Sequence, residues 1–111
     1  MSCIFCKIIN KEIPASIVYE DDKVLAFNDV DPQAPVHILF IPKEHIGGIV
    51  ELQNTAIIDN LFKVMKKVAT EQGLDQSGYR IVVNQGPDAG QAVGHLHFHL
   101  LAKRKLTWPP G

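Results

Sequence analysis

Three histidines alternate with large apolar residues in the segment 95–101, which reads HLHFHLL. Successive side chains of a β-strand point to opposite faces, so Leu96, Phe98 and Leu100 are expected in the core. The three imidazoles then share the other face at steps of roughly 7 Å. On a helix the same spacing would scatter the rings. The pattern therefore predicts a strand with one histidine-lined face.

Two kinds of chemistry suit such a face. Three imidazoles can ligate a catalytic metal, or they can surround a phosphoryl group, with one ring as nucleophile and the others as donors. The residue types alone do not distinguish a metal site from a phosphate site. An ordinary strand that exposes histidines without any function is the third possibility. The loop 84–91 favours phosphate, because Gly86 and Gly90 let backbone N–H groups approach an anion closely.

The length of 111 residues predicts one domain over 1–111. The chain carries 11 Lys and Arg against 12 Asp and Glu, a net charge of −1. This balance argues against binding of nucleic acid polymers through bulk charge, although it permits a single nucleotide. No apolar run approaches the roughly 18 residues of a membrane helix, and no signal peptide is recognisable. We therefore expect a soluble cytoplasmic protein that does not bind membranes.

The remaining periodicity predicts an α+β fold with an antiparallel sheet. A short helix is expected over 3–10 and a turn of helix over 44–51. A long amphipathic helix should begin after Asn54 as N-cap and end before Gly73, which suits the left-handed C′ position. The expected strands are 17–19, 24–27, 36–41, 79–83 and 93–102.

Cys3 and Cys6 form a C-x-x-C pair. A thioredoxin-type redox pair should lie between a strand and a helix, whereas only two residues precede Cys3 here. A structural zinc site needs four ligands, so His or carboxylate side chains would have to complete it. If the cysteines bind zinc, histidines are therefore candidates for the remaining ligands.

The chain resembles the histidine triad (HIT) family, and within it the histidine triad nucleotide-binding (Hint) branch. Segment 95–101 matches the motif H-φ-H-φ-H-φ-φ, in which φ is apolar. The resemblance covers essentially the whole chain. The other matching segments are CIFCKII at 3–9, AFNDVDPQAP at 26–35, HILFIPK at 37–43 followed by His45-Ile46, GYRIVVN at 78–84 and WPPG at 108–111.

This resemblance implies a five-stranded antiparallel sheet with one long and one or two short helices, paired into a ten-stranded sheet in a homodimer. It implies hydrolysis of purine nucleoside phosphoramidates through a covalent nucleotidyl-histidine, with release of the nucleoside monophosphate. The middle histidine, His97, would be the nucleophile, and His99 and His37 would contact the phosphate or the nucleophile. We expect the second ring nitrogen of His97 to donate to a carbonyl, the nearest being that of His95.

The resemblance also places residues around the nucleotide. A carboxylate at Asp29 suits two vicinal ribose hydroxyls. Phe27, with Ile4 or Phe5, would flank the base, and Asn84 would lie on the phosphate side. Besides His97 and His99, the nucleotide-binding residues implied in this way are Asp29, Phe27, Asn84 and Gln91.

For the cysteines, the resemblance supplies partners. Cys3, Cys6, His45 and His95 would complete a Cys2His2 tetrahedron around Zn2+. Four protein ligands make a closed, structural site. Such a site would anchor the N-terminal helix to the catalytic strand and constrain His97 from two residues away.

Two features concern the leaving group. Well-known eukaryotic Hint proteins have serine at the position of Ala92, so a hydroxyl that would assist the leaving group is missing here. They also have a bulky side chain at the position of Gly94. The tail 108–111 is implied to reach the partner subunit, with Trp108 near the partner's site.

Two other functions remain open from the sequence. The nucleotide pocket can serve as a sensor or an interaction surface with vestigial turnover. The chain can also hydrolyse dinucleoside polyphosphates, although that branch of the family is expected to lack the WPPG ending.

Overall fold

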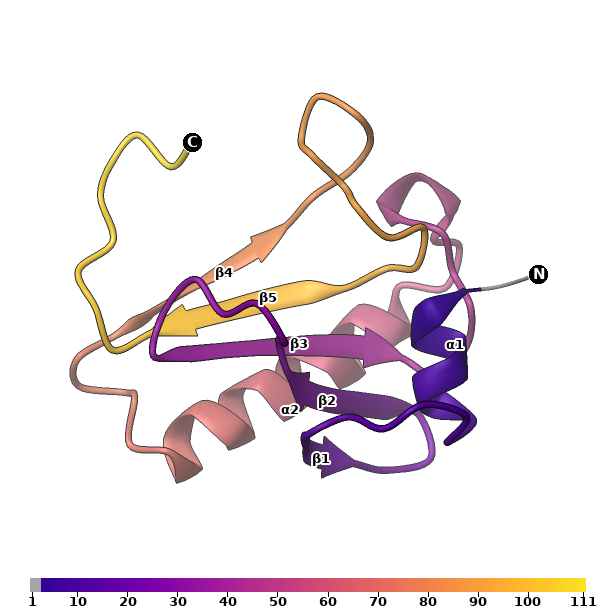
Figure 1. Ribbon diagram of the computed structural model, residues 1–111, viewed down its shortest axis with the longest axis horizontal. Helices are drawn as coiled ribbons and strands as arrows, with labels where there is room; N and C mark the ends of the chain where they lie inside the picture. The colour runs from indigo at the N-terminus through magenta and orange to yellow at the C-terminus, as the bar shows by residue number, and fades with distance from the viewer. Residues whose placement is uncertain (1–2) are drawn as a thin grey trace.

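The computed structural model describes residues 3–111 and contains a five-stranded antiparallel sheet in the order β1-β2-β3-β5-β4. The sheet is accompanied by a short helix α1, a long helix α2 and a 3-10 turn η1 (Figure 1). This confirms the predicted fold class. The elements are α1 (Ile4–Ile9), β1 (Ile17–Glu20), β2 (Val24–Asn28), β3 (Val36–Pro42), η1 (Ile49–Glu51), α2 (Ala56–Glu71), β4 (Tyr79–Val83) and β5 (Phe98–Ala102).

The two faces of the sheet carry different covers. Alternation along β2 sends Val24 and Ala26 into the cluster under α2, and Leu25 and Phe27 into a second cluster with α1. Figure 1 shows α2 behind the strands and α1 in front of them at one end. Because His37 on β3 and His99 on β5 have the same parity as the second cluster, their side chains lie on the α1 face.

The ends of α2 partly match the predicted caps. Thr55, not Asn54, is the N-cap residue, because the helix begins one residue later than expected. The Asn54 side chain still accepts a hydrogen bond from the backbone N–H of Ala56 at 3.0 Å. Gly73 follows the C-cap with φ 71°, which confirms its left-handed C′ role.

The turn of helix expected over 44–51 is confined to η1, since Gly48 before it has fully extended backbone. The strand expected over 93–102 is also shorter, because β5 begins at Phe98. The β3–β5 register ends where Phe40 pairs with Phe98, and its continuation would set Pro42 opposite Leu96. A proline has no N–H to continue the ladder. The N–H of Leu96 bonds instead to the carbonyl of Ile46.

The predicted alternation of 95–101 persists beyond the strand. Leu96, Phe98 and Leu100 are all buried in the cluster under α2, as expected. Within residues 3–111, no helix is both long enough and apolar enough to cross a membrane.

Candidate functional site

Histidines from the neighbouring strands β3 and β5 meet on the α1 face. His37 Nε2 lies 2.9 Å from His99 Nδ1. The His97 ring lies next to them, with its centroid 5.0 Å from that of His99. Only 6% of His37 and 6% of His97 is exposed. The structure thus brings three of the predicted catalytic side chains into one group.

A backbone carbonyl determines which nitrogen of His97 is free. His97 Nδ1 lies 2.7 Å from the carbonyl oxygen of His95, as expected from the sequence. A carbonyl only accepts, so Nδ1 carries the proton. In the neutral ring Nε2 then keeps a lone pair, which is the state of a nucleophile.

A second backbone group orders the other two rings. The N–H of Gln33 donates to His37 Nδ1 at 3.0 Å, so the proton of neutral His37 is on Nε2. That Nε2–H donates to His99 Nδ1, which leaves the proton of His99 on Nε2. Burial, followed by the neighbouring rings of His97 and His37, lowers the pKa of His99 to about 4. At neutral pH His99 is therefore an uncharged donor through Nε2.

Asp29 lies beside this pair of rings. Its Oδ2 is 3.4 Å from His37 Nε2, and its Oδ1 accepts from the N–H of Asp31 at 2.9 Å. The backbone N–H of Asp29 also donates to the carbonyl of His37. With 19% of its side chain exposed, Asp29 is held at the mouth of the histidine group and still reaches solvent.

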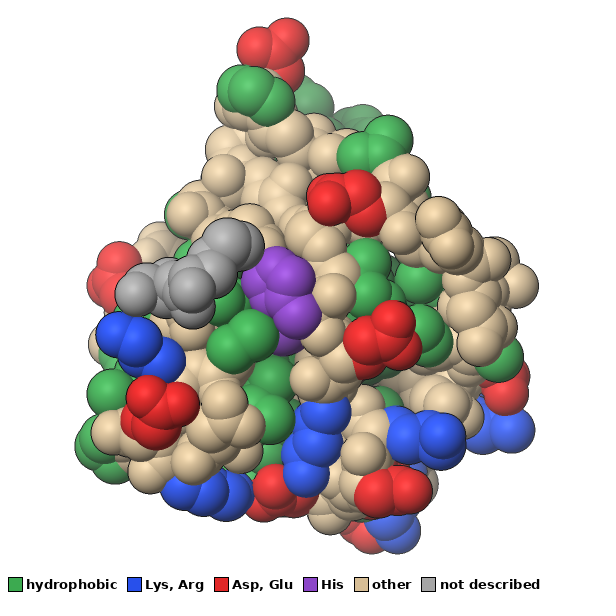
Figure 2. Space-filling model, turned by 90° about the vertical axis from the view of Figure 1, so that its right-hand side faces the viewer, with side chains coloured by type: hydrophobic (Ala, Val, Ile, Leu, Met, Phe, Trp, Pro, Cys, Tyr) green, Lys and Arg blue, Asp and Glu red, His purple; other side chains and the backbone are tan. Residues whose placement is uncertain are grey.

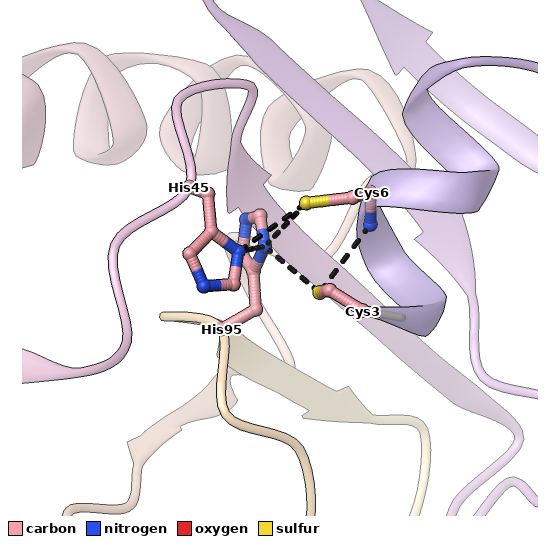
Figure 3. A group of neighbouring side chains, drawn as sticks. All are labelled: Cys3, Cys6, His45 and His95. Carbon is pink, nitrogen blue, oxygen red and sulfur yellow. Dashed lines mark hydrogen bonds between the residues drawn. The ribbon is translucent and has the colours of Figure 1, made fainter. Parts of the chain in front are cut away.

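A separate cluster lies where α1 meets the loops that precede η1 and β5. Figure 3 shows the four side chains converging from these elements. His95 Nδ1 is 3.4 Å from Cys3 Sγ, 3.7 Å from Cys6 Sγ and 3.1 Å from His45 Nδ1. Cys6 Sγ is 3.2 Å from His45 Nδ1. The structure therefore brings together the four predicted metal ligands: Cys3, Cys6, His45 and His95.

This Cys/His cluster is suited to a metal ion. In a tetrahedral zinc site with sulfur and nitrogen ligands, neighbouring ligand atoms are roughly 3.3 to 3.8 Å apart, close to the separations observed. His95 Nε2 donates to the carbonyl of Pro42 at 2.9 Å, so its Nδ1 lone pair faces the sulfurs. Burial lowers the pKa of His95, which keeps the ring neutral as a ligand must be. Burial and the neighbouring Cys3 raise the pKa of the Cys6 thiol, so two thiolates here need a cation.

Asp29, His37 and His99 also have ligand atoms close together. Their hydrogen bonds suit a metal less well. Metal-binding histidines usually donate through the far ring nitrogen. The far nitrogen of His37 instead accepts from Gln33, which leaves a proton on the nitrogen that would have to ligate.

Phe5 links α1 to both groups of histidines. Its ring contacts His95 and His97 edge-on, with centroids 5.9 Å and 5.3 Å apart. It also packs against Phe27 at 5.5 Å. Phe27 is 4% exposed and Phe5 6%, whereas Ile4 is 50% exposed. Of the two phenylalanines expected at the base, Phe5 thus contacts the His97 ring and Phe27 packs behind Phe5.

Two side chains fasten the loop 84–91, Gln85 by accepting from the N–H of Val50 and Gln91 by three hydrogen bonds. Gln91 Oε1 accepts from the N–H of Gly86, and its Nε2 donates to the carbonyls of Gly47 and Val93. The amide expected to contact the nucleotide therefore serves the loop itself. A cavity of about 500 Å³ opens here, with Gln91, Gly94 and His45 among its lining residues. An added Cβ at Gly94 would meet open space.

Two predicted residues lie away from the histidines' hydrogen bonds. Asn84 directly follows β4 and is half-buried. Trp108 is 80% exposed, and the guanidinium of Arg80 lies 6.0 Å from its ring. Arg80 also donates to the carbonyl of Thr107. Figure 1 shows the C-terminal tail beside β4, at the end of the molecule opposite α1.

The end of the molecule at which α1 lies has mixed charge. Figure 2 shows Lys and Arg side chains interspersed with acidic ones, and histidine side chains at the surface between hydrophobic groups. The surface in this view has no large patch of one charge of the kind that attracts a charged polymer.

Sequence reasoning missed two participants, Gln33 and Pro42. Both act through backbone atoms, the N–H of Gln33 on His37 and the carbonyl of Pro42 on His95. Backbone groups leave no side-chain signal. The two prolines before β3, Pro32 and Pro35, were the available hint that the chain turns back toward His37 there.

The geometry can be compared with known proteins. A family model described as HIT domain matches residues 10–106. A Brassica juncea protein named 14 kDa zinc-binding protein is 53% identical over 112 residues, which covers 97% of this chain and 98% of the relative. An Arabidopsis thaliana protein named Adenylylsulfatase HINT1 is 51% identical over 112 residues, covering 97% of this chain and 76% of the relative. The crystal structure of a HIT family hydrolase from Legionella pneumophila has a TM-score of 0.96 at 47% identity, covering 99% of this chain and all of the other.

Proposed function

This chain belongs to the HIT domain family, and on that premise we propose that it hydrolyses purine nucleoside phosphoramidates through a nucleotide covalently bound to His97. The observation that carries the proposal is the Nδ1–H of His97 on the His95 carbonyl, because it leaves Nε2 unprotonated beside a second ring that can donate. A nucleophile needs a lone pair, and developing phosphoryl charge needs a fixed donor.

The reaction takes two displacements at phosphorus. His97 Nε2 forms a bond to the α-phosphorus while the phosphorus–nitrogen bond to the leaving amine breaks, and the amine departs with a proton taken from solvent. Water then attacks the same phosphorus, the bond to His97 breaks, and the nucleoside monophosphate is released. The water of this second displacement returns a proton to solvent. The Nε2–H of His99 donates to a phosphoryl oxygen, and His37 holds His99 in that state.

The nucleotide lies against these rings in the proposed complex. Asp29 accepts from the ribose hydroxyls, which the partial exposure of its carboxylate, 19% of the side chain, supports. Phe27 and Phe5 form an apolar wall on the base side of His97. Asn84 contacts the phosphate side, and Gln91 contributes by shaping the loop 84–91.

A second substrate class has specific support. The Arabidopsis relative is named an adenylylsulfatase, and an adenylyl sulfate would yield the same nucleotidyl-histidine with sulfate as the leaving group. Sulfate leaves without a proton, which suits a site with alanine at position 92. Steady-state rates on adenosine phosphoramidate and adenylyl sulfate rank the two classes.

The experiment that tests the proposal compares wild type with His97→Ala on both substrates. We expect turnover by wild type and a loss of at least about a thousandfold in the variant, as for removal of other enzymatic nucleophiles. Equal rates would refute the role of His97. Tight binding of AMP with no turnover by wild type would favour the sensor, and cleavage of diadenosine polyphosphates alone would favour the remaining alternative.

We also propose that the Cys/His cluster of Cys3, Cys6, His45 and His95 holds one structural Zn2+. The donor set, the separations of the ligand atoms and the name of the Brassica relative support zinc. The ion would cross-link α1 to the segment before β5 and leave no open coordination position. Metal analysis of protein purified without added zinc should find about one zinc per chain, and metal-free protein with full stability would refute the structural role.

A homodimer completes the proposal. Strand β4 is an edge of the sheet, so its outward backbone groups can pair with a second copy to form a ten-stranded sheet. Trp108, on the tail beside β4, would then approach the partner's site. Light scattering should give twice the chain mass. The cytoplasmic location stays a prediction from the sequence.

A further inference from the structure

His95 takes part in two contacts that point in opposite directions. Its ring presents Nδ1 to Cys3, Cys6 and His45, while its backbone carbonyl accepts from His97 Nδ1 at 2.7 Å. We propose that His95 is a positioning residue through which metal held by the Cys/His cluster sets the tautomer of the nucleophile His97. The proposal rests on the proposed function, because it assigns control of the same nucleophile.

The backbone of His95 is not fixed by the sheet. Strand β5 begins at Phe98, so the carbonyl of His95 lies outside the ladder that pairs His99 with Leu39 and Val82. The peptide unit that carries this carbonyl is held by a loop instead, because its own N–H, that of Leu96, donates to the carbonyl of Ile46 next to His45. The position of the His95 carbonyl therefore depends on the loop that carries His45 and Ile46 as well as on where the His95 ring is anchored.

The ring of His95 has two anchors of different kinds. Its Nε2 donates to the carbonyl of Pro42, a bond that stands without metal. Its Nδ1 faces the two sulfurs and His45 Nδ1 at 3.1 to 3.7 Å, which is an anchor only when a cation draws these groups together. Cys6 and His45 contact each other at 3.2 Å in an exposed position, so a bound cation would be needed to tie both of them firmly to His95.

Metal bound at the Cys/His cluster would also act on His97 through helix α1. Cys3 and Cys6 flank Phe5, whose ring packs edge-on against both His95 and His97. A helix of six residues has little stability of its own. Coordination of both cysteines would hold α1 in place, and with it the wall that confines the His97 ring.

The expected consequence is a change in the nucleophile rather than in the fold. Without metal, the His97 ring should exchange between its Nδ1–H and Nε2–H forms, and the second form has no lone pair on the attacking nitrogen. We expect kcat to fall by about 10- to 100-fold, the usual cost of losing a group that orients a functional side chain, and to fall more than KM rises.

The test reads the ring directly by NMR of histidine nitrogens in zinc-loaded wild type, wild type stripped by a chelator, and His45→Asn in the same chelator. His45 is exposed, so its replacement leaves the core intact. Lys7→Ala changes α1 without touching a ligand, and Val68→Ala lowers stability from the α2 face. Both controls, loaded with zinc, should keep the Nδ1–H form of His97.

The proposal predicts Nδ1–H in the loaded protein, mixed forms in both metal-free samples, and recovery when zinc is returned to wild type. An unchanged ring in stripped wild type would overturn it, whatever happens to kcat. A mixed ring that also appears in loaded Val68→Ala would overturn it too, since general destabilisation would then suffice. The ring is read without turnover, so this result stands apart from any failure of the wild type to hydrolyse a phosphoramidate.

Discussion

His37 Nε2 lies 2.9 Å from His99 Nδ1. Because His37 Nδ1 accepts from the backbone N–H of Gln33, the proton between the two rings is on His37 Nε2. Replacing His37 with alanine removes this donor and lets His99 turn or change tautomer. We expect kcat to fall by on the order of a hundredfold, the lower end of the cost of losing one fixed donor to developing charge. Steady-state kinetics measures the fall, with Asp31→Asn nearby as the control. Unchanged kcat would remove His37 from the catalytic group.

The acid stability of the protein should depend on His99. Its pKa drops from an ordinary 6.5 to about 4 on folding, so between these pH values the unfolded chain binds more protons than the folded one. Stability from this ring is therefore present above about pH 6.5 and is lost as pH falls through about 4.

Replacing His99 with glutamine removes that dependence. Urea unfolding at several pH values between 7 and 4 should show a smaller loss of unfolding free energy in His99→Gln than in wild type. His95, whose pKa is also lowered by burial, remains in both proteins, so the difference isolates His99. Parallel pH profiles would contradict the assignment.

Ala92 is exposed in the segment that follows the loop 84–91. Ala92→Ser would supply a hydroxyl for protonating a departing amine, whereas sulfate needs no proton. We expect kcat on a phosphoramidate to rise by on the order of tenfold, below the contribution of a full general acid. The rate on adenylyl sulfate should not change. An equal effect on both substrates would show that the hydroxyl does not act on the leaving group.

Trp108 makes the proposed arrangement of the dimer measurable. It is the single tryptophan of the chain and is 80% exposed here, so its emission should shift to shorter wavelength if a partner's site covers it. Addition of AMP should then change its intensity, and Arg80→Ala should weaken the response by freeing the tail. Emission that is unaffected by nucleotide in a dimeric sample would place the tail elsewhere.

Side-chain patterns predicted the histidine face well because alternation decides which side of a sheet a residue occupies. The pattern HLHFHLL correctly separated Leu96, Phe98 and Leu100 from the imidazoles. It did not predict that β5 begins only at Phe98, since continuing the ladder would require an N–H from Pro42 of β3, which a proline lacks. A pairing partner of this kind is a property of the register and is invisible in the segment itself.

The metal ligands, too, could be predicted only in part from the local sequence. Cys3 and Cys6 were evident from their spacing, but His45 and His95 were joined to them only by resemblance, because 39 and 89 residues separate them from Cys6. The N–H of Gln33 and the carbonyl of Pro42, which determine the tautomers of His37 and His95, have no side-chain signature at all. The site residues could be predicted from the sequence, whereas the tautomers of their histidines could be assigned only from the structure.

The most direct test of the central claim is to stop the reaction of wild-type protein with an adenosine phosphoramidate within a single turnover and locate any bound nucleotide by mass spectrometry. The account predicts one adenylyl group on the peptide that contains His97, absent from His97→Ala. An adenylyl group on another residue, or turnover by His97→Ala at the wild-type rate, would contradict it.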